Sequence, residues 1–218
     1  MNNIYQDIME PWHSKFTDGQ AEEAAFVLAD AGNLNVAREL SLVAQAHRTI
    51  TTQLRQQLLA YIHSQSHGFF ETLIIDVVLS LGYAGRKRDL ARKIGRSGDG
   101  GIDGIIELDE LGLDAIYLQA KRLKPNNTVA ISSVRDFIGS LEARHASKGV
   151  FVTTGDFTKS AHLLTQAISK KVVLINGEKL ADLMIRHSIG TRVTETIQFK
   201  EIDPTYFQTR AHPTTKKV

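Results

Sequence analysis

Two alternating stretches separated by a turn constrain the fold of this chain more than any other part of the sequence. The first covers residues 98–106 and the second covers residues 114–122. Both alternate and carry β-branched or aromatic side chains, which is typical of β-strands. Residues 109–112, between them, end in glycine, as a tight turn requires. The sequence therefore predicts a β-hairpin over this part of the chain.

The predicted hairpin brings three polar side chains onto one small patch. Successive side chains of a strand point to opposite faces, so Gln119 and Lys121 share a face. With the turn centred near Leu111, Asp103 lies directly opposite Gln119 and diagonally from Lys121. A carboxylate followed on the next strand by (Glu/Gln)-x-Lys suits a metal-dependent phosphodiesterase, whose lysine orients water or neutralises charge on the phosphate. The alternative is a solvated polar face with a surface ion pair worth roughly 0–1 kcal/mol.

The whole stretch, beyond these three residues, resembles the catalytic domain of the Mrr-type restriction endonucleases, which belong to the PD-(D/E)XK nuclease superfamily. The resemblance extends over roughly residues 54–207 and rests on segments 70–71, 81–83, 94–106, 113–122, 149–154 and 172–178. It implies an α/β fold of the restriction-endonuclease type, in which helices flank a mixed β-sheet.

The resemblance also implies roles for individual residues. It makes Asp103 a metal ligand, Gln119 the family's variant of the usual acidic residue, Lys121 the catalytic lysine, and Glu71 an acidic residue that faces the site from a helix. The metal is expected to be Mg²⁺, with Mn²⁺ as a substitute, held by Asp103, Glu71 and the backbone carbonyl of Ala120. Because Gln119 is neutral, two anionic ligands remain, which favours one metal ion over two.

A basic run lies between the predicted helix at 69–81 and the hairpin. Residues 85–96 hold six basic residues and one acidic residue. Such a run grips the phosphodiester backbone without reading sequence. The residues expected to bind DNA are Arg86, Lys87, Arg88, Arg92, Lys93 and Arg96. The alternative is an ordinary solvated loop.

The helix predicted at 69–81 has a polar stripe and an apolar arc at helical spacing. Glu71 falls on the buried side of that stripe, where an unpaired carboxylate would be costly. We therefore expect a cationic partner for Glu71, which is the metal or Lys121 in the functional interpretation and an arginine of the core in the other. Nearby, His63 and His67 have helical metal-ligand spacing, but their neighbours indicate a linker instead.

The chain divides into three predicted parts: an N-terminal helical module with its linker over 1–66, a nuclease domain over 67–203, and a tail over 204–218. The module is predicted to hold helices at 18–32, 35–47 and 51–64. It is short for a winged-helix DNA-reading domain. It serves either for packing or dimerisation, or as a helical module that contacts DNA.

The nuclease domain continues with alternating helices and strands, predicted as helices at 132–144, 158–169 and 178–187 and as buried strands at 149–154 and 171–175. Near-continuous apolar strands of this kind indicate a sheet covered on both faces. An edge strand is predicted at 196–202. Thr153 and Thr154, at a strand end, are expected to cap the next helix, with a phosphate contact as the alternative.

Composition limits the remaining choices. The chain has no cysteine and a net charge of +2, so thiolate sites are excluded and DNA binding has to come from local charge. No apolar run approaches the ~18 residues of a membrane span, and we expect a cytoplasmic protein. The predicted function is a Mg²⁺-dependent endonuclease that cleaves double-stranded DNA in restriction of foreign or modified DNA, acting as a homodimer or higher oligomer. The alternatives are a structure-specific repair or recombination nuclease, and a DNA-binding protein that does not cleave.

Overall fold

The computed structural model describes residues 34–83, 91–93, 101–198 and 203–208. The helices are α3 (Leu34–Ser64), α4 (His67–Ser80), α5 (Ile131–Ala143), α6 (Lys159–Ala167), α7 (Gly177–Arg186) and α8 (Pro204–Gln208). The strands are β1 (Ala91–Lys93), β2 (Gly104–Glu107), β3 (Ala115–Lys121), β4 (Thr128–Val129), β5 (Lys148–Thr153), β6 (Asp156–Phe157) and β7 (Lys171–Ile175). None of the helices in these ranges is long and apolar enough to cross a membrane.

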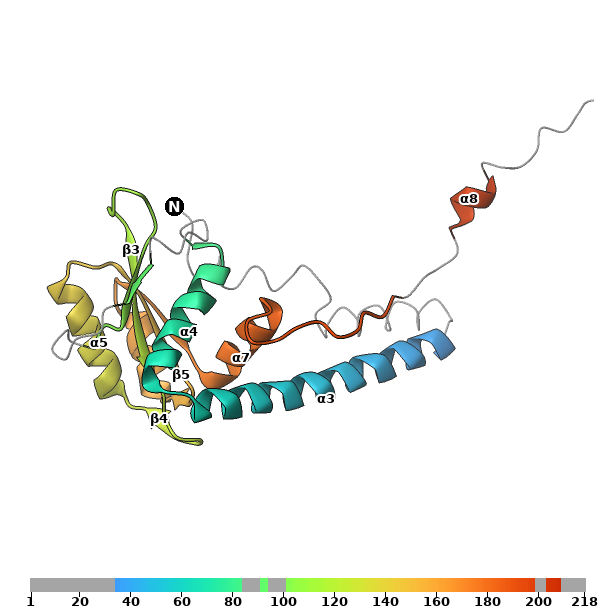
Figure 1. The fold of residues 1–218 in the computed structure, drawn as a ribbon, viewed down its shortest axis with the longest axis horizontal. Helices are drawn as coiled ribbons and strands as arrows, with labels where there is room; N and C mark the ends of the chain where they lie inside the picture. Colours follow the sequence, from blue (N-terminus) through green and yellow to red (C-terminus); the bar gives the residue numbers. More distant parts are fainter. Residues whose placement is uncertain (1–33, 84–90, 94–100, 199–202, 209–218) are drawn as a thin grey trace, which may run out of the picture.

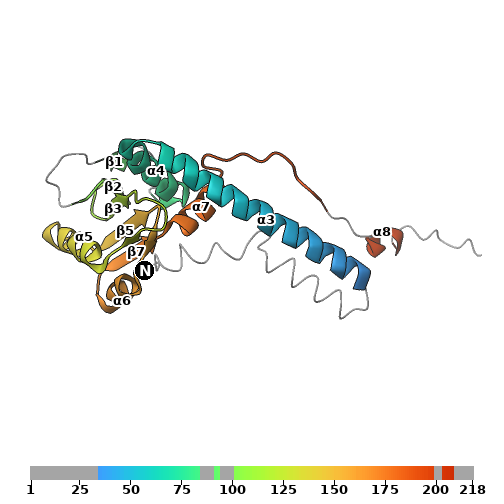
Figure 2. The ribbon, with the colours of Figure 1, turned by 90° about the horizontal axis from the view of Figure 1, so that it is seen from below.

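A mixed five-stranded sheet forms the centre of the fold, in the order β1-β2-β3-β5-β7. Strands β1, β2 and β3 are antiparallel neighbours, whereas β3, β5 and β7 run parallel. Helices α4 and α7 cover one face, and α5 and α6 cover the other (Figures 1 and 2). The predicted mixed sheet flanked by helices is confirmed. A second, two-stranded parallel sheet of β4 and β6 was not predicted.

Each face of the sheet packs its own apolar cluster, because side chains alternate along β3. Ile116 and Leu118 are buried in a cluster with the apolar side of α4 and α7. Tyr117, between them, packs against the opposite cluster, which α5 and α6 complete. Strand β3 is therefore sandwiched between helices, and its end toward Lys121 is held from both faces.

Helix α4 begins and ends where its sequence allows. The Ser66 side chain accepts a hydrogen bond of 3.1 Å from the Phe69 N–H, as an N-cap does. After the C-cap Leu81, Gly82 adopts φ +96°, a left-handed conformation that suits glycine. The helix predicted at 69–81 is confirmed.

One long helix replaces the two predicted at 35–47 and 51–64. Helix α3 runs without a break because no glycine or proline lies between the two segments, and the Thr49 hydroxyl bonds back to the Gln45 carbonyl at 3.0 Å. Its C-terminal part packs on the sheet domain, where Leu58 and Ile62 join the core. The helix predicted at 18–32 lies outside the described residues.

The edge strand predicted at 196–202 does not form over the residues that the structure describes. Residues 196–198 form no strand, since they are exposed and have no neighbouring strand; residues 199–202 lie outside the described part. The basic run, for which an ordinary loop was the alternative, contributes strand β1, which forms the edge of the sheet beside β2. The predicted tail contains the short helix α8.

Candidate active site

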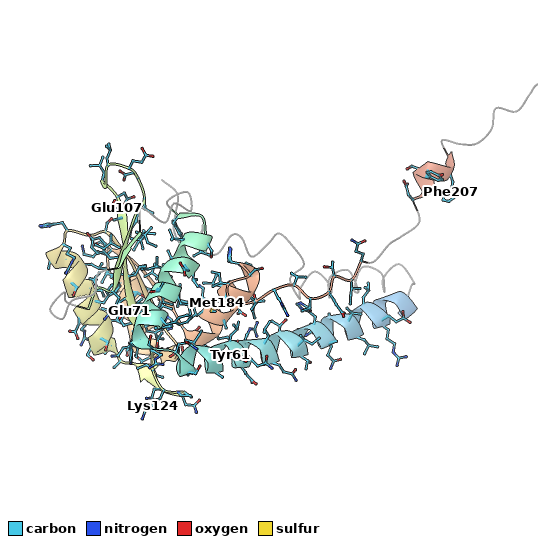
Figure 3. All side chains as sticks on the ribbon, viewed as in Figure 1. Tyr61, Glu71, Glu107, Lys124, Met184 and Phe207 are labelled. Atoms are coloured by element: carbon cyan, nitrogen blue, oxygen red, sulfur yellow. The ribbon has the colours of Figure 1, made fainter. Side chains whose placement is uncertain are left out.

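The register of β2 and β3 sets the position of Asp103. Gly104 pairs with Leu118 in this antiparallel ladder. The described ladder ends at this pair, and Asp103, one residue earlier, bonds to Leu118 and Ala120, which flank Gln119. The site lies at the end of β3 remote from the hairpin turn; Figure 3 labels Glu107 and Lys124 near these two ends.

Asp103 is fastened to β3 through both its backbone and its side chain. Its N–H donates to the Leu118 carbonyl at 2.8 Å, and its Oδ2 accepts from the Ala120 N–H at 2.7 Å. The backbone groups of alternate residues point to the same neighbouring strand, so the Ala120 carbonyl faces the side on which Asp103 lies. The carboxylate thus occupies the place where the ladder would otherwise continue.

The Gln119 side chain lies against the backbone of Gly101. A Cβ atom built on Gly101 would come within 2.7 Å of Gln119 Nε2, and Gly101 has φ +80°. Gln119 Oε1 is buried and accepts no hydrogen bond from the described residues. A buried acceptor without a donor is costly, so this oxygen is suited to a ligand that the chain itself does not supply.

Lys121 is held at two points. Its Nζ donates a hydrogen bond of 3.0 Å to the Ser133 hydroxyl on the first turn of α5. Its backbone carbonyl accepts a hydrogen bond of 2.7 Å from the Thr153 hydroxyl at the end of β5. Both the direction of the side chain and the position of the strand end are therefore defined.

Thr153 and Thr154 fasten the end of β3 and the residues that follow it, and they cap none of the described helices, so the prediction of a cap is wrong. The Thr154 hydroxyl bonds to the Leu123 N–H and carbonyl, each at 2.9 Å. The cap of α6 is Thr158, which accepts from the Ala161 N–H at 3.3 Å. The threonines are buried because parallel β5 brings its C-terminal end beside that of β3.

Arg122, next to Lys121, connects the site to the end of α3. Its guanidinium donates to the backbone carbonyls of His63, at 2.7 Å, and Gln65. These carbonyls lie at the α3–α4 junction, where helix termination leaves acceptors unsatisfied. Burial, together with the charge of Arg122, lowers the pKa of His63 below its ordinary value. His63 thus contributes a backbone acceptor from the last turn of α3, and only residues 65–66 of the predicted linker lie outside a helix.

Glu71 lies in the first half of α4, which packs against β2 and β3 (Figure 3). It is half-buried, between the buried Phe70 and the half-buried Thr72. Within the described ranges, no three His, Asp or Glu side chains lie close enough together to hold a metal ion. The metal set of Asp103, Glu71 and the Ala120 carbonyl thus stays a prediction.

The oxygen donors at the end of the hairpin nevertheless fit a hard divalent cation. Asp103 supplies a carboxylate, Ala120 a carbonyl directed to the same side, and Gln119 a buried amide oxygen with no donor in the described part of the chain. Mg²⁺ prefers oxygen ligands of these kinds and retains water in the other positions. These residues therefore fit such an ion, with a carbonyl and an amide oxygen in place of further carboxylates.

The predicted DNA-binding run is described only through β1. Arg86, Lys87, Arg88 and Arg96 lie outside the described residues, as do the side chains of Arg92 and Lys93. The backbone of Lys93 pairs with Gly104, which directly follows Asp103. Strand β1 of the run thus lies beside the residue that follows Asp103.

Sequence reasoning missed Ser133 and misassigned Thr153. Ser133 lies beyond a loop from Lys121, and its only sequence signal is its place in the first turn of the following helix. The Thr153 contact depends on the parallel pairing of β3 with β5.

Comparisons of the sequence with known proteins identify a family. The Mrr catalytic-domain family, described as restriction endonuclease, matches residues 62–184. The type IV methyl-directed restriction enzyme EcoKMrr of Escherichia coli (strain K12) is 38% identical over 164 residues, which are 75% of this chain and 52% of that protein. The chain therefore spans about half the length of this relative.

Two solved structures are also similar. The DNA modification-dependent restriction endonuclease AspBHI has a TM-score of 0.49 at 24% identity, covering 65% of this chain and 36% of that one. The MspJI restriction endonuclease in complex with a 27-mer oligonucleotide has a TM-score of 0.46 at 27% identity, covering 64% of this chain and 32% of that one. The sequence match to the family model spans more than half of the 218 residues. On that match, the chain belongs to the Mrr-type restriction endonuclease family.

Proposed function

We propose that this protein is a metal-dependent endonuclease that hydrolyses phosphodiester bonds of double-stranded DNA in restriction of modified DNA. The observation that carries the proposal is the hydrogen bond of 2.7 Å from the Ala120 N–H to Asp103 Oδ2 in a chain of this family, because Ala120 lies between Gln119 and Lys121 on β3. The relative EcoKMrr is named a methyl-directed enzyme, which supports methylated DNA as the substrate class. We expect the protein to act in the cytoplasm, where the DNA lies.

Restriction endonucleases generally use a divalent metal ion, and we propose Mg²⁺, with Mn²⁺ as a substitute. Asp103, the Ala120 carbonyl and Gln119 Oε1 would hold it, with Glu71 as a further ligand from α4. When bound, the ion polarises the scissile phosphate and lowers the pKa of water. We propose one ion per site, because the neutral Gln119 leaves too little negative charge for two. A DNA complex that holds two metal ions per site would contradict this.

Lys121 supplies positive charge where the phosphate gains negative charge during hydrolysis. An ammonium has three N–H donors, and one of them is directed to Ser133. The other two can donate to a phosphate oxygen or to the attacking water. Its loss should therefore lower the cleavage rate more than it lowers DNA affinity.

Arg86, Lys87, Arg88, Arg92, Lys93 and Arg96 are proposed to bind the DNA backbone, since their run leads into the strand beside Asp103. Phosphate contacts of this kind position the duplex without reading its sequence. A homodimer or higher oligomer is proposed because cleavage of both strands needs two active sites.

The test is cleavage of methylated and unmethylated plasmid, with Mg²⁺ or with EDTA. Wild type is expected to cut with Mg²⁺ only, and Lys121→Ala is expected to bind DNA but to cut it far more slowly. Lys171→Ala is the matched control, since Lys171 is exposed at the start of β7, at the other edge of the sheet. A preference for methylated plasmid supports the restriction role.

Other results of the same assay lead elsewhere. Wild type that binds DNA but never cuts it, with any divalent metal, would establish a non-cleaving DNA-binding protein. Faster cutting of branched than of linear DNA, without dependence on methylation, would establish a structure-specific nuclease.

A further inference from the structure

We propose that Ser133 is a positioning residue for Lys121, holding its ammonium in the direction needed for cleavage. The inference rests on the proposed nuclease function, because it assigns a partner to the lysine of that site. The carrying observation is the hydrogen bond of 3.0 Å from Lys121 Nζ to Ser133 Oγ.

The Ser133 hydroxyl is held in a fixed position by helix α5. Ser133 lies in the first turn of α5, and its N–H donates to the Ala130 carbonyl at 3.1 Å. The helix is anchored in the core by Val134 and Phe137, which are completely buried. A short side chain on an anchored helix has little freedom, so its oxygen is a defined acceptor.

The Lys121 side chain, by contrast, is flexible by itself. A lysine side chain has four rotatable bonds and loses considerable rotamer freedom when it is ordered. The Thr153 hydroxyl defines the backbone of Lys121 by donating to its carbonyl at 2.7 Å, but it does not reach the ammonium. Ser133 supplies the second point, at the far end of the side chain.

The acceptor of the Lys121 hydrogen bond is uncharged. A serine hydroxyl accepts a hydrogen bond without carrying a charge, whereas a carboxylate in its place would neutralise the ammonium. Lys121 therefore keeps its positive charge and two N–H donors for the phosphate. A neutral anchor is the type of partner that a charge-stabilising lysine needs.

Ser132 offers a matched control on the same helix turn. It is exposed, whereas Ser133 is half-buried, and the Lys121 ammonium bonds to Ser133. Ser132→Ala therefore removes an identical side chain from an adjacent position without removing the contact. Ser133→Thr keeps the hydroxyl and tests rescue.

The experiment measures single-turnover cleavage of linear DNA with saturating Mg²⁺, together with DNA affinity and thermal unfolding, for the full chain. Ser133→Ala should cut about 10- to 100-fold more slowly, because loss of positioning has effects of that size. Its DNA affinity and melting temperature should match those of wild type. Ser133→Thr should recover most of the rate, and Ser132→Ala should cut like wild type.

A double variant separates positioning from an independent role. If Ser133 acts through Lys121, Ser133→Ala should slow cleavage no further in a Lys121→Ala background. Additive losses in the double variant would overturn the proposal. So would a Ser133→Ala variant that cuts at the wild-type rate, or one whose slower cutting follows lost stability and is not rescued by threonine.

The failure of this proposal differs from a failure of the proposed function. Wild type that cuts DNA beside an equally active Ser133→Ala overturns only the role of Ser133. Wild type that does not cut removes both.

Discussion

The guanidinium of Arg122 donates a hydrogen bond of 2.7 Å to the backbone carbonyl of His63 and thereby ties the strand of the candidate site to the last turn of α3. Helix α4, which carries Glu71, begins at His67, three residues after α3 ends at Ser64. A single side chain thus connects the strand of Lys121 to the junction of two helices.

Arg122→Ala is expected to lower the free energy of unfolding by about 1–3 kcal/mol, because carbonyls at the end of α3 lose a charged donor. Urea denaturation measures the change. Lys124→Ala is the control, since Lys124 is exposed and projects from the body in Figure 3. Equal stabilities of the two variants would show that the Arg122 contacts do not stabilise the junction.

Acidification should destabilise the protein partly through His63. Burial and the charge of Arg122 lower the folded-state pKa of His63 below 6.5, so the unfolded chain takes up this proton first. Stability is therefore full above that value and falls as pH drops through it toward the folded-state pKa. In His63→Gln, the unfolding free energy should fall less steeply between about pH 7.5 and about pH 5.5.

His67→Gln is the control for this pH dependence, because His67 is exposed and lies only four residues further along the chain, at the start of α4. It should show the wild-type slope. A wild-type slope in His63→Gln as well would mean that His63 does not contribute.

Replacing Gly101 by alanine should disturb the Gln119 side chain. Gly82→Ala introduces a side chain at φ +96° with nothing within 4 Å, so it should cost about 1–2 kcal/mol of backbone strain alone. Gly101→Ala adds, at φ +80°, an approach of 2.7 Å to Gln119 Nε2. Urea denaturation and DNA cleavage should both show a larger loss for Gly101→Ala, and equal cleavage by the two variants would argue against a role for Gln119.

The end of α3 should behave as part of the nuclease core. Ile62 is 3% exposed, and Ile62→Ala should cost about 2–5 kcal/mol of unfolding free energy. Ile50, on the same helix, is 63% exposed, and Ile50→Ala should change stability by less than about 0.5 kcal/mol. The two variants are compared by urea denaturation, and similar losses would place the end of α3 outside the core.

Contacts of helix α3 cross the domain boundary predicted between residues 66 and 67. Arg55 of α3 forms an ion pair with Asp182 of α7, and Leu58 lies in the core cluster. We therefore expect a fragment that starts at residue 67 to be less stable than one that retains the second half of α3.

The hairpin and its register could be predicted from the sequence because strand pairing across a short turn is local. The alternation around Gln119 defines the faces, and a turn centred near Leu111 defines which residue lies opposite. The helical spacing of α4 and the alternation of later strands and helices were informative for the same reason. The break predicted within α3 was wrong, because the polar residues near Thr49 are compatible with a helix and interrupt only its apolar pattern.

By itself, the sequence determined helix α4, the hairpin of β2 and β3 with its register, and the later alternation of α5, β5, α6, β7 and α7. It did not determine β1, β4 or β6. The tertiary structure alone decided that Ser133 holds the ammonium of Lys121, that Thr153 holds its backbone, and that Arg122 reaches the end of α3. The physical reason is that a local pattern specifies which face a side chain takes. The partner on that face comes from an element distant in sequence, whose approach is set by packing of the whole core.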